Sequence, residues 1–67
     1  MGFKYGQKVY TINAKTNAVD AWTYGGALHT AKGILYRLEN GPKYCYLPAR
    51  CVYETELGAR FIADSYR

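Results

Sequence analysis

The stretch GILYRLENGPKYCYLPARCVY, residues 33–53, decides the fold of this chain. Within residues 34–39 every second side chain is apolar, which is the period of a β-strand with one buried face. Asn40-Gly41-Pro42 then favours a turn, because its residues tolerate a positive φ or resist continuing a helix. The apolar and aromatic residues 44–47 resume an extended segment. We therefore predict a β-hairpin of strands 33–39 and 43–47, followed by a short strand at 51–54.

A helix from Thr30 to Asn40 is the alternative for the first half of this stretch, and it would make the fold α+β. Four apolar residues there have the i, i+3, i+4, i+7 spacing of an amphipathic helix, and Thr30 is placed to cap its start. Against this helix, Gly33 in its first turn costs about 1 kcal/mol relative to alanine, and Tyr36 is a weak helix former. The Asn-Gly turn before a tyrosine-rich run favours the strand.

The composition indicates a single small globular domain with an aromatic core. The chain has 67 residues, 49% of them hydrophobic, which argues against intrinsic disorder. A chain of this length buries only about 60% of the surface that it exposes when unfolded. Eight tyrosines, two phenylalanines and one tryptophan compensate, because large rings fill a core with few residues.

The charge and the hydropathy pattern bear on partners and location. Nine Lys and Arg against five Asp and Glu give a net charge of +4, and the basic residues form no run. A positive excess permits contact with phosphates or acidic proteins. The N-terminal residues contain no apolar signal region, and no apolar run approaches the ~18 residues of a membrane span. We expect a cytoplasmic protein with reduced cysteines and no membrane contact.

The remaining segments predict two more strands and a C-terminal helix. β-Branched and aromatic residues favour strands at about 8–13 and 18–24. Thr55 is placed to cap a helix at about 56–65. The segment Gly25–Lys32 is either a functional loop or an ordinary connector. The side chains expected to be mostly buried are those of Val9, Ile34, Tyr36, Leu38, Leu47, Val52, Leu57 and Phe61.

The order of these elements resembles that of small SH3-like barrel proteins found among the products of bacteriophages and mobile elements. The likeness rests on GQKVYTI at residues 6–12, the ENG turn at 39–41, the LPA turn at 47–49, and VYET at 52–55 leading into the helix. The resemblance implies a mainly β fold, a five-stranded SH3-like barrel with one C-terminal helix, and a binding role. It carries over no catalytic residue.

The residues that support catalysis or metal binding are few. His29, Cys45 and Cys51 are the soft metal ligands of the sequence, whereas a structural zinc takes four, in closely spaced pairs. A Cys–His nucleophilic pair would lack an orienting third group. Gly25-Gly26 lacks the later Gly and Lys of a phosphate-binding loop. We therefore predict no enzymatic activity, no cofactor and no metal site.

The aromatic surplus is the feature that points to function. On strand 43–47, an inward Cys45 and Leu47 would turn Tyr44 and Tyr46 outward. We expect the two rings of strand 18–24 to face outward as well. Such rings, near basic side chains, stack bases or anchor a protein partner. Alternatively, the terminal helix covers some of them and makes a second small core. The candidate binding residues are Trp22, Tyr24, Arg37, Lys43, Tyr44, Tyr46 and Arg50.

These observations predict a non-catalytic binding module. Its expected role is that of a phage or mobile-element protein that docks on a host protein or nucleoprotein complex and modulates or inhibits it. The alternative is a nucleic-acid-binding SH3-like barrel that uses a basic, aromatic face. The scattered basic residues favour a protein partner, with weak and non-specific binding of nucleic acid.

Overall fold

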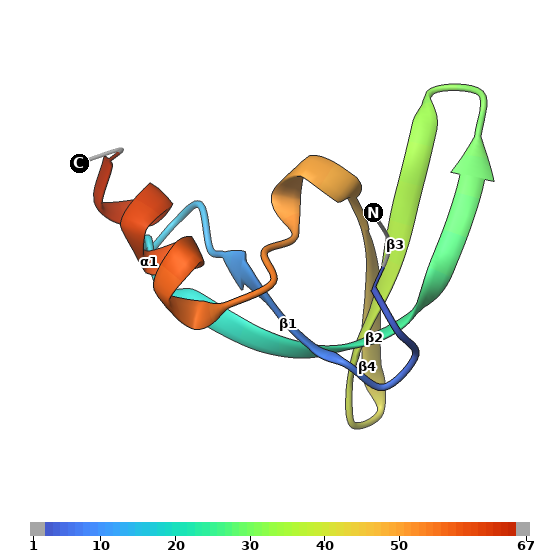
Figure 1. The fold of residues 1–67 in the computed structure, drawn as a ribbon, viewed down its shortest axis with the longest axis horizontal. Helices are drawn as coiled ribbons and strands as arrows, with labels where there is room; N and C mark the ends of the chain where they lie inside the picture. Colours follow the sequence, from blue (N-terminus) through green and yellow to red (C-terminus); the bar gives the residue numbers. More distant parts are fainter. Residues whose placement is uncertain (1–2, 66–67) are drawn as a thin grey trace.

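A computed structural model, which describes residues 3–65, contains one antiparallel sheet and one α-helix (Figure 1). The four strands lie side by side in the order β1-β2-β3-β4. The fold is therefore mainly β with one C-terminal helix, as the sequence predicts. The elements are β1 (Lys8–Ile12), β2 (Val19–Thr30), β3 (Gly33–Asn40), β4 (Lys43–Pro48), the short 3-10 helix η1 (Ala49–Cys51) and α1 (Glu56–Ser65).

The hairpin predicted from residues 33–47 is confirmed, and the alternative helix at 30–40 is wrong. β3 and β4 pair from Leu35–Pro48 down to Asn40–Lys43, so only Gly41 and Pro42 form the turn. Gly41 has a φ of 63°, a value that glycine adopts without strain. The apolar residues have helical spacing, but the turn favours the hairpin because the turn fixes the register of both strands.

β2 is longer than predicted, because the segment from Gly25 onward continues the strand. The β2–β3 register shifts between Tyr24 and Ala27, which makes Gly25-Gly26 a β-bulge inside β2. Gly26 has a φ of 122°, outside the range of ordinary strand residues. Beyond the bulge, β2 pairs with the first half of β3 to form a long two-stranded arm. The arm ends in the turn at 31–32, so this segment is not an irregular loop.

The predicted five-stranded barrel is not confirmed, because the sheet of residues 3–65 is open. In place of the strand expected at 51–54, the chain passes from η1 into an isolated bridge between Tyr53 and Tyr10. Two backbone hydrogen bonds form this bridge, at 2.9 and 2.8 Å. The chain then turns into α1, and the described residues after the bridge form no fifth strand. The sheet still curves strongly, with η1 between α1 and the β2–β3 arm (Figure 1).

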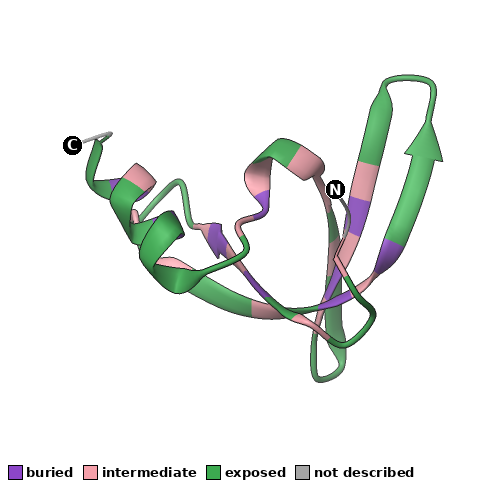
Figure 2. Ribbon diagram, in the orientation of Figure 1, coloured by how far each residue is buried: buried purple, intermediate pink, exposed green. Residues whose placement is uncertain are grey.

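The core lies on the inner side of the curved sheet and is rich in aromatic rings (Figure 2). Val9 and Leu38 are completely buried at its centre. Around them, the rings of Tyr24 and Tyr36 meet edge to face with centroids 5.4 Å apart, and Phe3 lies 5.6 and 5.4 Å from the same two rings. Four side chains expected in the core are buried, and a fifth, Leu47, is half-buried against it. The four are Val9, Tyr36, Leu38 and Val52.

Three side chains expected in the core are exposed instead: Ile34 at 41%, Leu57 at 81% and Phe61 at 73%. Ile34 lies on the β2–β3 arm, beyond the part of the sheet that the core covers. The other two lie on the side of α1 opposite the buried Ala59 and Ala63, through which the helix packs.

Small residues and a polar contact fix how α1 sits on the sheet. The Asn17 side chain donates a hydrogen bond to the Ala63 carbonyl at 2.8 Å, which holds the alanine side of the helix next to the β1–β2 connection. Thr55 accepts from the Gly58 N–H at 3.0 Å, so the predicted cap is confirmed. The expected C-terminal helix is present, but it packs through Ala59 and Ala63 rather than through Leu57 and Phe61.

The depth of the core generates a stability prediction. Leu38→Ala should lower the free energy of unfolding by about 2–5 kcal/mol, because it opens a cavity at a fully buried position. Leu57→Ala, the matched control on α1, should change it by less than about 0.5 kcal/mol. Denaturant unfolding followed by circular dichroism measures both. Equal losses in the two variants would contradict this core.

Candidate functional site

The alternation of side chains along β4 separates the core from an exposed aromatic surface. Cys45 and Leu47 are half-buried against the core, whereas Tyr44 and Tyr46 are 59% and 42% exposed. This arrangement confirms the orientation predicted for the four residues. On the outer face of β3, Glu39 lies opposite Tyr44, and Arg37 lies opposite Tyr46.

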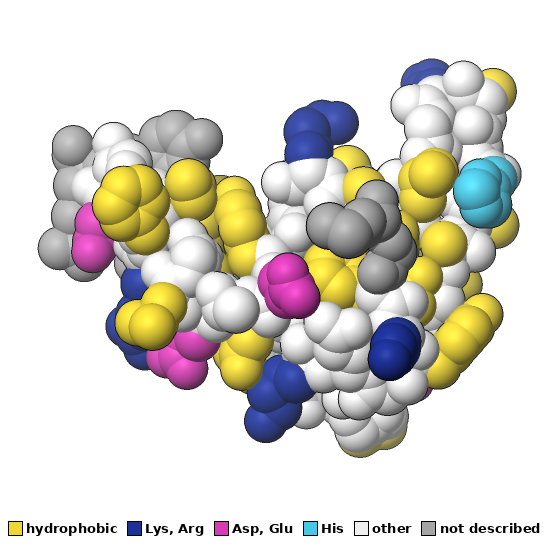
Figure 3. Space-filling view, in the orientation of Figure 1, with side chains coloured by type: hydrophobic (Ala, Val, Ile, Leu, Met, Phe, Trp, Pro, Cys, Tyr) yellow, Lys and Arg dark blue, Asp and Glu magenta, His cyan; other side chains and the backbone are white. Residues whose placement is uncertain are grey.

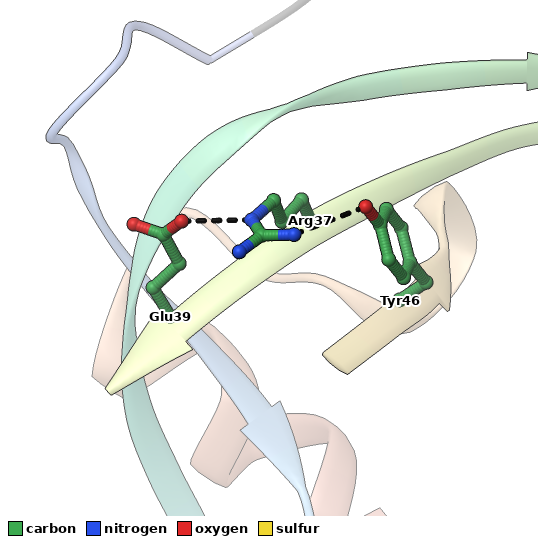
Figure 4. A network of polar contacts seen from close by, with 3 residues as sticks. All are labelled: Arg37, Glu39 and Tyr46. Atoms are coloured by element: carbon green, nitrogen blue, oxygen red, sulfur yellow. Dashed lines mark hydrogen bonds and ion pairs between the residues drawn. The ribbon is translucent and has the colours of Figure 1, made fainter. Parts of the chain in front are cut away.

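Arg37 links Glu39 and Tyr46 through hydrogen bonds (Figure 4), and it also lies over the ring of Tyr44. Its Nε donates to Glu39 Oε2 at 2.8 Å, and a terminal nitrogen donates to the Tyr46 hydroxyl at 3.1 Å. The guanidinium carbon lies 4.2 Å from the centre of the Tyr44 ring and 5.8 Å from that of Tyr46. The hydrogen bond to Glu39, and then that to Tyr46, raise the pKa of Arg37. The arginine is therefore charged, lies over the ring of Tyr44, and has its charge neutralised by Glu39.

The β-bulge makes room for this network. A Cβ atom at Gly25 would lie 3.0 Å from the Glu39 carboxylate. At Gly26 it would lie 3.2 Å from the ring of Tyr5, which is itself exposed. The two glycines thus let the Glu39 side chain and the Tyr5 ring approach the backbone of β2 closely. Because neither glycine has a side chain, nothing at these two positions covers the surface beside Arg37.

A shallow hollow on the outer face joins these features. It is lined by Arg37 and Tyr46 together with Tyr5, the bulge, Ala27 and Leu28. We call the exposed Tyr5, Leu28, Tyr44 and Tyr46, together with the half-buried Arg37 and Glu39, the outer-face patch. Tyr5, Leu28 and Glu39 are members of this patch that were not among the residues predicted from the sequence. The signal that could have found them was Gly25-Gly26, since paired glycines inside a strand mark a bulge and a close approach.

Two of the predicted binding residues belong to the core instead. Tyr24 pairs with Leu38, and Trp22 with Val9, so their side chains share the face of these buried residues. The expectation that both rings face outward is therefore wrong.

The surroundings of the two rings agree with this placement. Burial is the main cause that raises the pKa of Tyr24, followed by the nearby Tyr36 and Tyr5. The Trp22 indole donates to the Thr11 hydroxyl at 3.0 Å, which satisfies its N–H in a half-buried place. Both rings therefore have structural partners within the domain.

The two remaining predicted residues, Lys43 and Arg50, are exposed but do not join Arg37. Lys43 lies beside the β3–β4 turn, opposite Asn40. Arg50 lies in η1, where it borders a hollow formed with Ile12 and Tyr53. The structure therefore brings together Arg37, Tyr44 and Tyr46 of the predicted set, without a cluster of basic side chains.

The reactive side chains lie apart from one another. His29 pairs with Ile34, and Cys45 with Leu38, so they are separated by roughly 13 Å along β3. Burial raises the pKa of the Cys45 thiol, which lowers its thiolate fraction at neutral pH. Among residues 3–65, no three His, Cys, Asp or Glu side chains are grouped so that they could hold a metal ion. The absence of enzymatic activity, cofactor and metal stays a prediction.

Comparisons with protein-family models, with curated proteins and with solved structures found no match to this chain. The resemblance to small SH3-like barrels therefore rests on its short motifs alone and stays a prediction. In the part of the chain that the structure describes, no helix is long and apolar enough to cross a membrane.

The contact between the bulge and Glu39 generates a local prediction. Gly25→Ala should displace the Glu39 carboxylate and loosen its bond to Arg37 without unfolding the sheet, because Gly25 does not have a positive φ. The exchange rate of the Arg37 Nε–H with water, measured by NMR, should rise towards that of a Glu39→Ala reference. An unchanged rate in Gly25→Ala would contradict the close packing of the two residues.

Proposed function

We propose that this protein is a non-catalytic binding module that docks on another protein through the outer-face patch. The observation that carries the proposal is the network of Arg37 with Tyr44 and Tyr46, in which a half-buried arginine lies over one exposed ring and donates a hydrogen bond to the hydroxyl of another. Tyrosine and arginine are enriched among the residues that dominate protein interfaces. Rings held in place before binding lose little conformational freedom when a partner covers them.

The charge distribution supports a protein partner over nucleic acid. Glu39 already neutralises Arg37, and Arg37 covers the Tyr44 face that a base would otherwise stack on. On the face that Figure 3 shows, the lysine and arginine side chains lie apart from one another rather than along a groove. Single-stranded nucleic acids are bound by a continuous basic groove with free aromatic faces. Binding of nucleic acid is kept as the second candidate because the net charge is +4.

The size of the domain sets how much of its surface a partner must cover. A stable interface buries about 800 Å² on each partner, which is roughly a sixth of the 5111 Å² that this chain exposes. The outer-face patch, from Tyr5 across Arg37 to Tyr44, is the region where exposed rings lie around an arginine. We infer that the partner lies across the outer face of β3 and β4.

The finer parts of the proposal rest on the sequence resemblance. The protein would come from a bacteriophage or mobile element, act in the cytoplasm, and modulate or inhibit the host protein or nucleoprotein complex on which it docks. Its curved sheet would be an SH3-like barrel in which the bridge at Tyr53 takes the place of the fifth strand.

Titrations with random single-stranded and duplex DNA separate the two candidates. We expect weak binding that falls steeply between about 50 and 200 mM salt, because a few lysine–phosphate contacts would supply all of it. Fluorescence anisotropy of labelled DNA measures this. Tight binding at the higher salt, lost in Arg37→Ala and Lys43→Ala, would contradict the protein-docking proposal and favour nucleic acid.

The docking surface is tested with host extract passed over the immobilised protein. A host protein retained by the parent chain should be lost with folded Tyr46→Ala or Arg37→Ala, because each removes one member of the network. Leu57→Ala is the control, since it removes an exposed apolar side chain on α1 and should retain the same protein. Loss in the control alone would place the docking surface on the helix.

A further inference from the structure

One side of β4 has no neighbouring strand. In the order β1-β2-β3-β4, β4 is an edge strand, and no strand of the described residues pairs with its free edge, the one away from β3. Edge strands present unpaired backbone N–H and C=O groups that another chain can bind.

The hairpin register decides which backbone groups of β4 point to this free edge. The closing pair of a two-residue hairpin exchanges both of its backbone hydrogen bonds, and every second pair after it does the same. Starting from Asn40 and Lys43, this gives Lys43, Cys45 and Leu47 as the β4 residues bonded to β3. The N–H and C=O groups of Tyr44 and Tyr46 then point to the free edge. Pro48 follows the same alternation as Tyr44 and Tyr46, so an N–H at this position would not have bonded to β3, and the proline costs the hairpin no hydrogen bond.

The sequence of β4 is symmetric about Cys45. A tyrosine stands on each side of it, and Pro42 and Pro48 lie three positions away in either direction. An antiparallel strand of the same sequence, centred on the same residue, would therefore place each tyrosine opposite a tyrosine. Since proline cannot donate, the pairing would end in the same way at both ends.

We propose that two copies of this chain pair antiparallel through their β4 edges, with Cys45 facing Cys45 across a two-fold axis. Tyr44 of each copy exchanges backbone hydrogen bonds with Tyr46 of the other. Lys43 faces Leu47 of the second copy, so no like charges stand opposite each other. The second copy is the occupant because the edge is complementary to itself, as a two-fold interface requires.

The paired sheets would also change the proposed docking surface. All four tyrosines of the two β4 strands keep their rings on the outer face, since side chains opposite one another share a face. The two outer-face patches become neighbours across the axis. This inference goes beyond the proposed function, and it concerns the purified protein alone, so its failure would leave partner docking standing.

Two substitutions at one position test the backbone pairing. Tyr46→Pro removes the N–H that points to the free edge, whereas Tyr46→Ala keeps this N–H and removes only the ring. Sedimentation over a concentration series should give a dimer for the parent chain. The dissociation constant of the dimer should rise roughly 30-fold more in the proline variant than in the alanine variant. The two-fold interface loses one hydrogen bond from each copy, and each lost bond raises the dissociation constant roughly fivefold. Circular dichroism checks that both variants fold.

A chemical cross-link tests the register. Opposed residues that exchange no hydrogen bonds have Cα atoms about 4.5 Å apart in an antiparallel pair, within the range of a disulfide. Oxidation of the Cys51→Ser variant by diamide should therefore yield a cross-linked dimer, whereas Cys45→Ser, which keeps Cys51, should not. A chain that stays monomeric at the highest concentration reached, an equal effect of the two Tyr46 substitutions, or cross-linking only through Cys51 would overturn the proposal.

Discussion

Arg37 and Leu38 are neighbours in the sequence but lie on opposite faces of β3, and this alternation organises the whole domain. Leu38 is buried with Val9 at the centre of the core, while Arg37 lies outside over the ring of Tyr44. The turn at Gly41 and Pro42 fixes the register that produces both results. A shift by one residue would bury the arginine and expose the leucine, so the stability of the core and the geometry of the outer-face patch depend on the same hydrogen-bonded ladder.

The bulge at Gly25-Gly26 is the second constraint, because it lies where β2 passes from the core into the β2–β3 arm, whose outer end is exposed. Before the bulge, Tyr24 faces inward and packs with the rings of Phe3 and Tyr36. At the bulge, the missing side chains leave space for Glu39, which holds Arg37 in place. The patch is thus assembled from three strands and the segment before β1, although its ion pair joins residues only two positions apart.

Local patterns in the sequence predicted the hairpin, the first two strands, the cap at Thr55 and the outward direction of Tyr44 and Tyr46. These features depend on turn chemistry and on alternation within one segment. What failed depended on packing between segments. The apolar stripe of α1 contains Leu57 and Phe61, but Ala59 and Ala63 allow a closer approach, and the sheet selects that side. Similarly, the faces of Trp22 and Tyr24 were predicted wrongly because the strand partners that decide them, Val9 and Leu38 respectively, are distant in the sequence.

The β2–β3 arm extends past the core, and its outer end is supported by its own ladder and by the bond from the Thr30 hydroxyl to the Gly33 carbonyl. Because residues 28–34 are all exposed, a change in the length of the arm there would disturb no buried contact, provided that both strands change equally. The turn at Ala31-Lys32 is therefore the place where paired insertions or deletions can change the length of the β2–β3 arm during evolution. It is equally the place where an epitope or a fluorescent label can be inserted with the sheet left intact.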